Sequence, residues 1–111
     1  MGAQAKMMGI SGCDYISGTD PVLAPTNKQW WMFKTNEATE ITEFEEIPVS
    51  VINNNWQTGL AADAITITDR SYCGVSLMAG MEIYFDGPVI SITLASGSGV
   101  AYCIAGDNPG A

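Results

Sequence analysis

Residues able to do acid–base or nucleophilic chemistry are scarce in this chain of 111 residues, which contains no histidine. Without histidine there is no Ser-His-Asp or Cys-His arrangement, and the commonest general base and transition-metal ligand are missing. The thiols of Cys13, Cys73 and Cys103 would need a nearby cation to become nucleophiles, and the chain has only four basic residues. No P-loop, G-x-G-x-x-G, C-x-x-C or H-E-x-x-H motif occurs either. We therefore expect no enzymatic activity, no catalytic residue and no cofactor.

The three cysteines are an odd number at wide spacing, which is a poor basis for a disulfide framework. We interpret them as small buried apolar residues. A Cys73–Cys103 bridge remains an alternative, because both residues lie on expected late strands.

Carboxylates are the remaining candidates for chemistry. Glu82 and Asp86 share one face of an expected strand, and Glu43, Glu45 and Glu46 form an acidic cluster. Two carboxylates can serve a glycosidase, but acids on a solvent-facing strand are more often simply hydrated. Loop aspartates could supply oxygen ligands to calcium, although none has EF-hand spacing; they are Asp14, Asp20, Asp63, Asp69, Asp86 and Asp107. We expect them to make local turns, and we expect no metal site.

The aromatic stretch NKQWWMFK, residues 27–34, is the stronger lead. Neighbouring side chains of a strand point to opposite faces, so only one of Trp30 and Trp31 can enter a core. The other ring must be covered by the N-terminal segment or by a neighbouring subunit, and tryptophan is enriched among interface anchors. A third tryptophan, Trp56, lies in an expected loop. We predict that an interface uses these aromatic and apolar residues: Trp30, Trp31, Met32, Phe33 and Trp56.

The charge of the chain excludes several partners. The net charge is −8, with 12 acidic residues against four basic ones. Nucleic-acid binding needs cations to neutralise phosphates, so neither DNA nor RNA is expected as a partner. Anionic membrane surfaces are disfavoured for the same reason, and no apolar run is long enough to span a membrane. The N-terminus has no continuous apolar region typical of a secretory signal, so we expect assembly in a cytoplasm.

The first quarter of the chain, residues 1–27, has scattered glycines and prolines and no hydrophobic period, which predicts an extended N-terminal arm. A β-domain, residues 28–111, is expected to follow, beginning with a strand at 29–34. Residues 40–47 are ambiguous: Ile41, Phe44 and Ile47 recur every three residues, as in a helical turn or an irregular edge segment. Residues 49–52 are expected to form another strand.

From residue 63 onwards, apolar and small polar residues alternate with period two through five segments, which is the strand signature. The connectors are short, with a two-residue hairpin expected at Ala79-Gly80 and a tight turn at Asp86-Gly87. The predicted fold is all-β: a small antiparallel β-sandwich or barrel, jelly-roll-like, with an extended N-terminal arm. The presumed outer faces of the late strands carry small neutral residues, including Ala101 and Cys103. Because charged residues usually protect sheet surfaces, we expect a second sheet or another subunit to cover these faces.

The segment AITITDRSYCGVSLMAGMEIYFDGPVISITLASGSGVAYCIAG, Ala64 to Gly106, resembles the short β-rich proteins of tailed bacteriophage virions, most closely the capsid decoration (cement) proteins. The resemblance covers about the C-terminal 40% of the chain and rests on composition and strand order. It implies a symmetric β-protein, a trimer being favoured, docked on a lattice of the major capsid protein at the virion surface.

The leading expectation is therefore a structural virion protein that binds and stabilises a phage head lattice through non-covalent contacts. One alternative is another head or tail component, such as a fibre or an adaptor. A second alternative is a small carbohydrate-binding β-sandwich module, because exposed tryptophans can stack on sugar rings.

Overall fold

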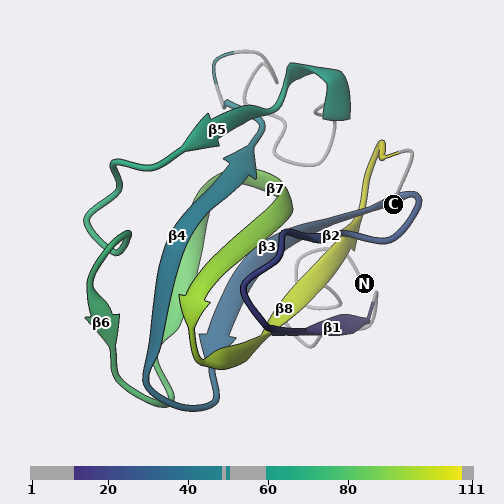
Figure 1. Cartoon of the computed structure of the whole chain (residues 1–111). Coiled ribbons are helices and arrows are strands. Elements are labelled where there is room, and N and C mark those ends of the chain that lie inside the picture. The colour runs from purple at the N-terminus through teal and green to yellow at the C-terminus, as the bar shows by residue number, and fades with distance from the viewer. Residues whose placement is uncertain (1–11, 49, 51–59, 109–111) are drawn as a thin grey trace.

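The computed structural model describes residues 12–48, 50 and 60–108. These residues form an all-β fold whose eight strands belong to one antiparallel sheet, as the alternating sequence pattern predicted (Figure 1). The strand order is β1-β8-β3-β7-β4-β5, with β2 beside β7 and β6 beside β4. The strands are β1 Cys13–Ser17, β2 Val22–Leu23, β3 Lys28–Thr35, β4 Thr39–Glu46, β5 Ile65–Ile67, β6 Ser76–Leu77, β7 Glu82–Ser96 and β8 Ser98–Ala105.

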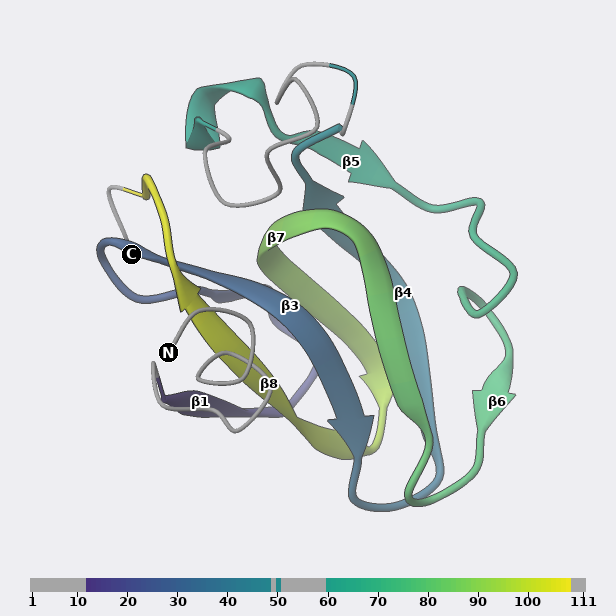
Figure 2. The ribbon, with the colours of Figure 1, turned by 180° about the vertical axis from the view of Figure 1, so that it is seen from behind.

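Strand β7 turns this single sheet into a sandwich. Its first part pairs with β3, where Ile83 lies opposite Phe33, and its second part pairs with β4, where Ile92 lies opposite Phe44. Figure 2 shows β7 bending over between β3 and β4, so that the sheet folds back on itself. The two apolar inner faces thereby cover each other, which is how a sheet sandwich excludes water.

The prediction of a tight turn at Asp86-Gly87 was wrong, because β7 runs through this dipeptide without ending. The backbone of Gly87 passes so close to the chain after β4 that a Cβ there would overlap the carbonyl oxygen of Ile47. Its N–H donates to the carboxylate of Glu46, at 3.1 Å. The glycine therefore serves a close approach at a bend, and the bend replaces the expected turn.

The hairpin prediction at Ala79-Gly80 was also wrong, because β6 pairs with β4 whereas the start of β7 pairs with β3. The segment between β6 and β7 is instead tied to Thr35 at the end of β3. Thr35 donates its hydroxyl to the carbonyl of Met78 at 2.6 Å, and its carbonyl accepts from the N–H of Gly80.

Strand β4 resolves the ambiguity of residues 40–47. The residues form a strand that lies between β7 and the short strands β5 and β6, so it is neither a helical turn nor an edge. Its register shifts between Ile41 and Glu43, where one extra residue bulges out of the ladder. The bulge turns Ile41 and Phe44, three residues apart, to the same side, and both are buried.

The core lies between the two layers and is mostly aliphatic, but its largest buried side chains are rings. Trp30 and Phe33 of β3 and Phe44 of β4 have at most 1% exposed surface. Opposite the β3 rings, the inner face of β8 has only small residues: Ala101 pairs with Phe33 and Cys103 pairs with Trp30. The expectation that Ala101 and Cys103 face outward was therefore wrong. They are small because bulky rings of the neighbouring strand fill the space before them.

The segment that was expected to be an N-terminal arm contributes two strands in its described part. Strand β1 pairs with β8 along its whole length, and β2 pairs with β7 around Ile92. Residues 12–27 thus belong to the same sheet as the rest of the domain. The first eleven residues and the strand expected at 49–52 lie outside the described residues, apart from Ser50.

Candidate functional site

The outer face of strands β1, β8, β3 and the first part of β7 carries aromatic side chains, where a solvent-facing sheet usually carries charged ones. We call these residues the aromatic face: Tyr15, Trp31, Tyr84 and Tyr102. Their common orientation follows from the register, since Met32 lies opposite Tyr102 on one side and Tyr84 on the other. Residues directly opposite each other in antiparallel strands have side chains on the same face.

A bulge in β3 brings Trp31 onto this face. The register of β3 shifts between Trp30 and Met32 against both neighbouring strands. Trp30 therefore points into the core with no exposed surface, while Trp31 and Met32 both lie on the outer side. The two adjacent tryptophans are separated by the sheet, as strand geometry requires.

The rings of the aromatic face contact one another and remain partly open to solvent. The ring centroid of Trp31 lies 5.9 Å from that of Tyr84 and 6.4 Å from that of Tyr102, with tilted planes in both pairs. Tyr84 is 58% exposed and Tyr15 is 63% exposed. The Tyr84 hydroxyl donates to Glu82 at 2.8 Å, and this hydrogen bond raises the pKa of Tyr84. The indole Nε1 of Trp31 is buried and has no hydrogen-bond partner within the described residues.

The other residues that were expected at an interface lie elsewhere. Trp30 and Phe33 are fully buried core residues, and Met32 is 6% exposed beneath the aromatic face. Trp56 lies outside the described residues. Of the described members of that set, Trp31 is the one that is partly exposed, with intermediate burial.

Behind the aromatic face, one partly buried carboxylate fixes Trp30 and strand β1. Asp14 accepts a hydrogen bond from the indole Nε1 of Trp30 at 2.8 Å and another from the thiol of Cys103 at 3.0 Å. Burial, followed by this contact with Asp14, raises the pKa of Cys103 to about 12. A thiol held protonated in this way is a structural group with no nucleophilic character at neutral pH.

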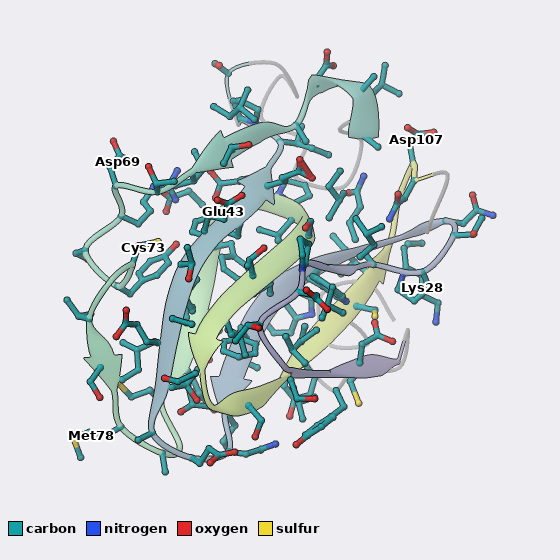
Figure 3. The ribbon with its side chains drawn as sticks, viewed as in Figure 1. Lys28, Glu43, Asp69, Cys73, Met78 and Asp107 are labelled. Carbon is teal, nitrogen blue, oxygen red and sulfur yellow. The ribbon has the colours of Figure 1, made fainter. Side chains whose placement is uncertain are left out.

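A second apolar surface runs along the opposite end of the sheet, beside β5 and β6. We call it the aliphatic edge: Leu60, Ile65, Val75 and Met78, which are 45–74% exposed. Figure 3 shows Met78 at the periphery of the molecule, directed away from the sheet. No charged residue occurs between Arg70 and Glu82, so strand β6 and its flanks lack the charges that usually protect a sheet edge.

The expected acidic groups play structural or surface roles in this arrangement. Glu46 is 3% exposed and forms a bidentate pair with Arg70, at 2.6 and 3.1 Å, which raises the pKa of Arg70. Arg70 also contacts the exposed carboxylate of Asp86, at 3.1 Å. Glu82 and Asp86 share the outer face of β7, but four residues of strand span about 13 Å, beyond the separation of carboxylates in glycosidases.

Within the described residues, no group of three or more Cys, Asp or Glu side chains is placed to hold a metal ion. Cys13, Cys73 and Cys103 are all free thiols, so the alternative of a Cys73–Cys103 bridge is not realised. Cys103 is buried as expected and Cys73 is partly buried, but the expectation of burial was wrong for Cys13, which is exposed on the outer strand β1. No helix in the described part of the chain is long and apolar enough to cross a membrane.

Comparison with known protein families, with curated proteins and with solved structures finds no match for this chain. The fold and its surfaces therefore define a small antiparallel β-sandwich with an aromatic face and an aliphatic edge.

Sequence reasoning missed three members of the aromatic face: Tyr15, Tyr84 and Tyr102. Tyr84 and Tyr102 each alternate with core residues in their strand. The period-two pattern therefore shows which residues of the same strand share a face with each tyrosine. Which of the two faces of β7 and of β8 points outward depends on their register with β3, and no local sequence pattern contains that information.

Proposed function

We propose that this chain is a structural virion protein that decorates a phage head and stabilises its lattice of major capsid protein through non-covalent contacts. The resemblance of Ala64–Gly106 to decoration proteins supports the class of function. A self-associated unit, with a trimer favoured, would present several copies of the same contact surface to a symmetric lattice.

The aliphatic edge is the observation that carries this proposal. Val75 and Met78 lie beside an uncharged edge strand and are 45% and 74% exposed. Burying such a side chain from full exposure is worth about 1.5–3 kcal/mol, so covering what remains exposed of Val75 or Met78 contributes about half to three-quarters of that. Exposed apolar side chains at a sheet edge favour association with another protein, and an edge strand can also pair with a strand of that partner.

Binding to a capsid lattice in this way requires no catalytic step. A protein that binds the assembled shell and not its free subunits stabilises the shell by mass action. A modest free energy at each site suffices, because the contact is repeated over the whole particle. The strongly acidic composition disfavours contact with packaged nucleic acid and so suits the outer surface of a particle.

The experiment that tests the proposal is cosedimentation with empty heads of the phage that encodes the chain. Wild-type protein is expected to bind saturably and to raise the temperature at which the heads disrupt. The variant Val75→Lys/Met78→Lys is expected to lose at least about tenfold in affinity, because each substitution would place a charge in an apolar contact.

The control is Tyr84→Ala, which removes an exposed ring from the aromatic face and leaves the aliphatic edge intact. It is expected to bind heads as wild type does. If the edge variant binds as well as wild type, or if wild-type protein stays in the supernatant, the proposed lattice contact is wrong.

A further inference from the structure

The aromatic face offers a row of rings that runs across the strands. Tyr102, Met32 and Tyr84 lie opposite one another on β8, β3 and β7, and the ring of Trp31 covers the centre of this row. Successive ring centroids are 6.4 and 5.9 Å apart and the ring planes are tilted by 53° and 41°, so a chain whose successive units stack on these rings must twist from one unit to the next. Tyr15 extends the row onto β1, since it lies opposite Val100, two residues from Tyr102.

The chemistry of this row suits sugars. The face of an aromatic ring carries negative charge density and attracts the weakly positive C–H groups of a pyranose. The tyrosines of the row also carry hydroxyl groups at the ring edge, where sugar hydroxyls lie, whereas Trp31 offers only its ring because its Nε1 is buried. Glu82 adds a carboxylate beside Tyr84 and has acceptor positions left after receiving the Tyr84 hydroxyl, so it can accept from a sugar hydroxyl.

The aromatic face by itself is small for a protein partner. Four strands span about 15 Å and five residues of strand span about 17 Å, so the face covers roughly 250 Å². A specific protein interface needs about 800 Å² on each partner. Met32, in the middle of the face, adds almost no accessible area because it is 6% exposed.

The charges on the face narrow the class of ligand. Glu82 lies beside Tyr84 on the outer side of β7, and the chain as a whole carries 12 acidic groups against four basic ones. An anionic polysaccharide would be repelled by these groups, whereas a neutral one is not. Lys34 lies opposite Glu82 and supplies donors for neutral hydroxyl groups.

From this geometry we propose that the aromatic face binds a chain of neutral pyranose sugars, with successive units stacked on Tyr102, Trp31 and Tyr84. This activity goes beyond the proposed lattice contact and uses a different surface. A particle decorated by the aliphatic edge would then present the aromatic face to glycans at its exterior.

The test is titration of the purified full chain with neutral hexasaccharides of glucose, xylose and mannose, followed by calorimetry and by tryptophan emission. At least one of these sugars is expected to bind and to change the emission of the wild-type protein. Tyr84→Ala and Tyr102→Ala are each expected to weaken that binding about tenfold or more, as loss of a stacking ring at a small site does.

Met78→Ala is the matched control, because it removes an exposed apolar side chain from the aliphatic edge and should leave sugar affinity unchanged. Circular dichroism spectra and thermal midpoints of the three variants show whether each remains folded.

Absence of binding by all three sugars at millimolar concentration would overturn the proposal, as would unchanged affinity in both ring variants. A fall in oligomeric mass on Tyr84→Ala, without sugar binding by wild type, would assign the face to a protein contact instead. None of these outcomes affects the head-binding experiment, which depends on Val75 and Met78.

Discussion

At the scale of single residues, the two adjacent tryptophans have opposite roles. Trp30 is a core residue whose indole N–H satisfies the carboxylate of Asp14, whereas Trp31 is a surface residue whose indole N–H has no partner in the described structure. Two large rings can be adjacent in the sequence because the strand places Trp30 on the core side of the sheet and Trp31 on its outer side.

Replacing Trp30 by Phe is expected to destabilise the fold by about 2–4 kcal/mol, because it removes a hydrogen bond to a charged group and leaves a small cavity. Trp31→Phe is the matched control and should cost less than about 1 kcal/mol, since its N–H has no partner to lose. Urea unfolding followed by far-UV circular dichroism measures both values. Equal costs for the two variants would contradict the assigned roles.

The raised pKa of Cys103 predicts a loss of stability at alkaline pH. Its ordinary pKa of 9.0 rises to about 12 in the fold, so the unfolded chain releases the thiol proton first as pH increases. This contribution to stability is therefore intact below about pH 9 and is lost progressively towards pH 12. Cys103→Ala should flatten the dependence of the unfolding free energy on pH between 8 and about 10.

Cys73→Ala is the control for this pH series. Burial also raises the pKa of Cys73, but its side chain is only partly buried, so its removal should flatten the curve less. A Cys103→Ala curve parallel to that of wild type would show that the thiol is not held protonated by the fold.

At the scale of elements, the bend of β7 is the feature on which the sandwich depends. The bend is supported from β4, because the carboxylate of Glu46 accepts the N–H of Gly87 and is itself held by Arg70. The guanidinium of Arg70 lies over the ring of Phe44, 5.7 Å from its centroid, which fixes it against the core.

Gly87→Ala is expected to cost at least about 2–3 kcal/mol, because the new Cβ would overlap the carbonyl oxygen of Ile47 and force β7 away from Glu46. Gly18→Ala provides the comparison. Gly18 has a positive φ of 80° and open space around it, so that substitution introduces only backbone strain of about 1–2 kcal/mol. Thermal and urea unfolding measure the loss of stability in both variants. A smaller loss for Gly87→Ala than for Gly18→Ala would show that Gly87 does not closely approach Ile47.

Arg70→Met should cost about 3–5 kcal/mol, because it leaves the buried carboxylate of Glu46 without its countercharge. The double variant Glu46→Gln/Arg70→Met should be less destabilised than Arg70→Met alone, since a neutral amide can still accept from Gly87. Asp86→Asn tests the exposed partner and should cost less than about 1 kcal/mol. Additive effects of the two single substitutions, Glu46→Gln and Arg70→Met, would show that the pair is not coupled.

At the scale of the whole molecule, two apolar surfaces lie at opposite ends of the strand order. The aromatic face belongs to β1, β8, β3 and the first part of β7, and the aliphatic edge accompanies β5 and β6. They differ in chemistry as well as position, which supports two separate partners.

Repulsion between molecules of net charge −8 opposes further association beyond the proposed trimer at neutral pH, and this repulsion should weaken near the isoelectric point of about 4.1. Light scattering is expected to show increasing association as the pH falls from 7 towards 4. Val75→Ser/Met78→Ser should reduce this association, whereas Tyr84→Ser should leave it unchanged. Equal behaviour of both variants would show that the aliphatic edge is not the associating surface.

Much of the architecture could be predicted from the sequence, and each wrong prediction has an identifiable structural cause. The period-two alternation after residue 63 correctly predicted an all-β fold, and Gln29–Lys34 was recognised as a strand. Of the five strands expected there, two are joined in the single long strand β7, so the described residues after residue 63 form four. The helical period of Ile41 and Phe44 misled because a bulge, set by pairing with β7, changes the local count of residues. The small size of Ala101 and Cys103 was read as exposure, although it is complementary to Trp30 and Phe33.

The sequence by itself determined the all-β class, the lack of histidine-based chemistry and the acidic charge, because these follow from residue identity and from the local pleat of a strand. Only the tertiary structure decided the bend of β7, the burial of Trp30 with the exposure of Trp31, and the gathering of Tyr15, Tyr84 and Tyr102 into one face. The physical reason is that alternation defines two sides of each strand, whereas register and packing between distant strands decide which side meets the core.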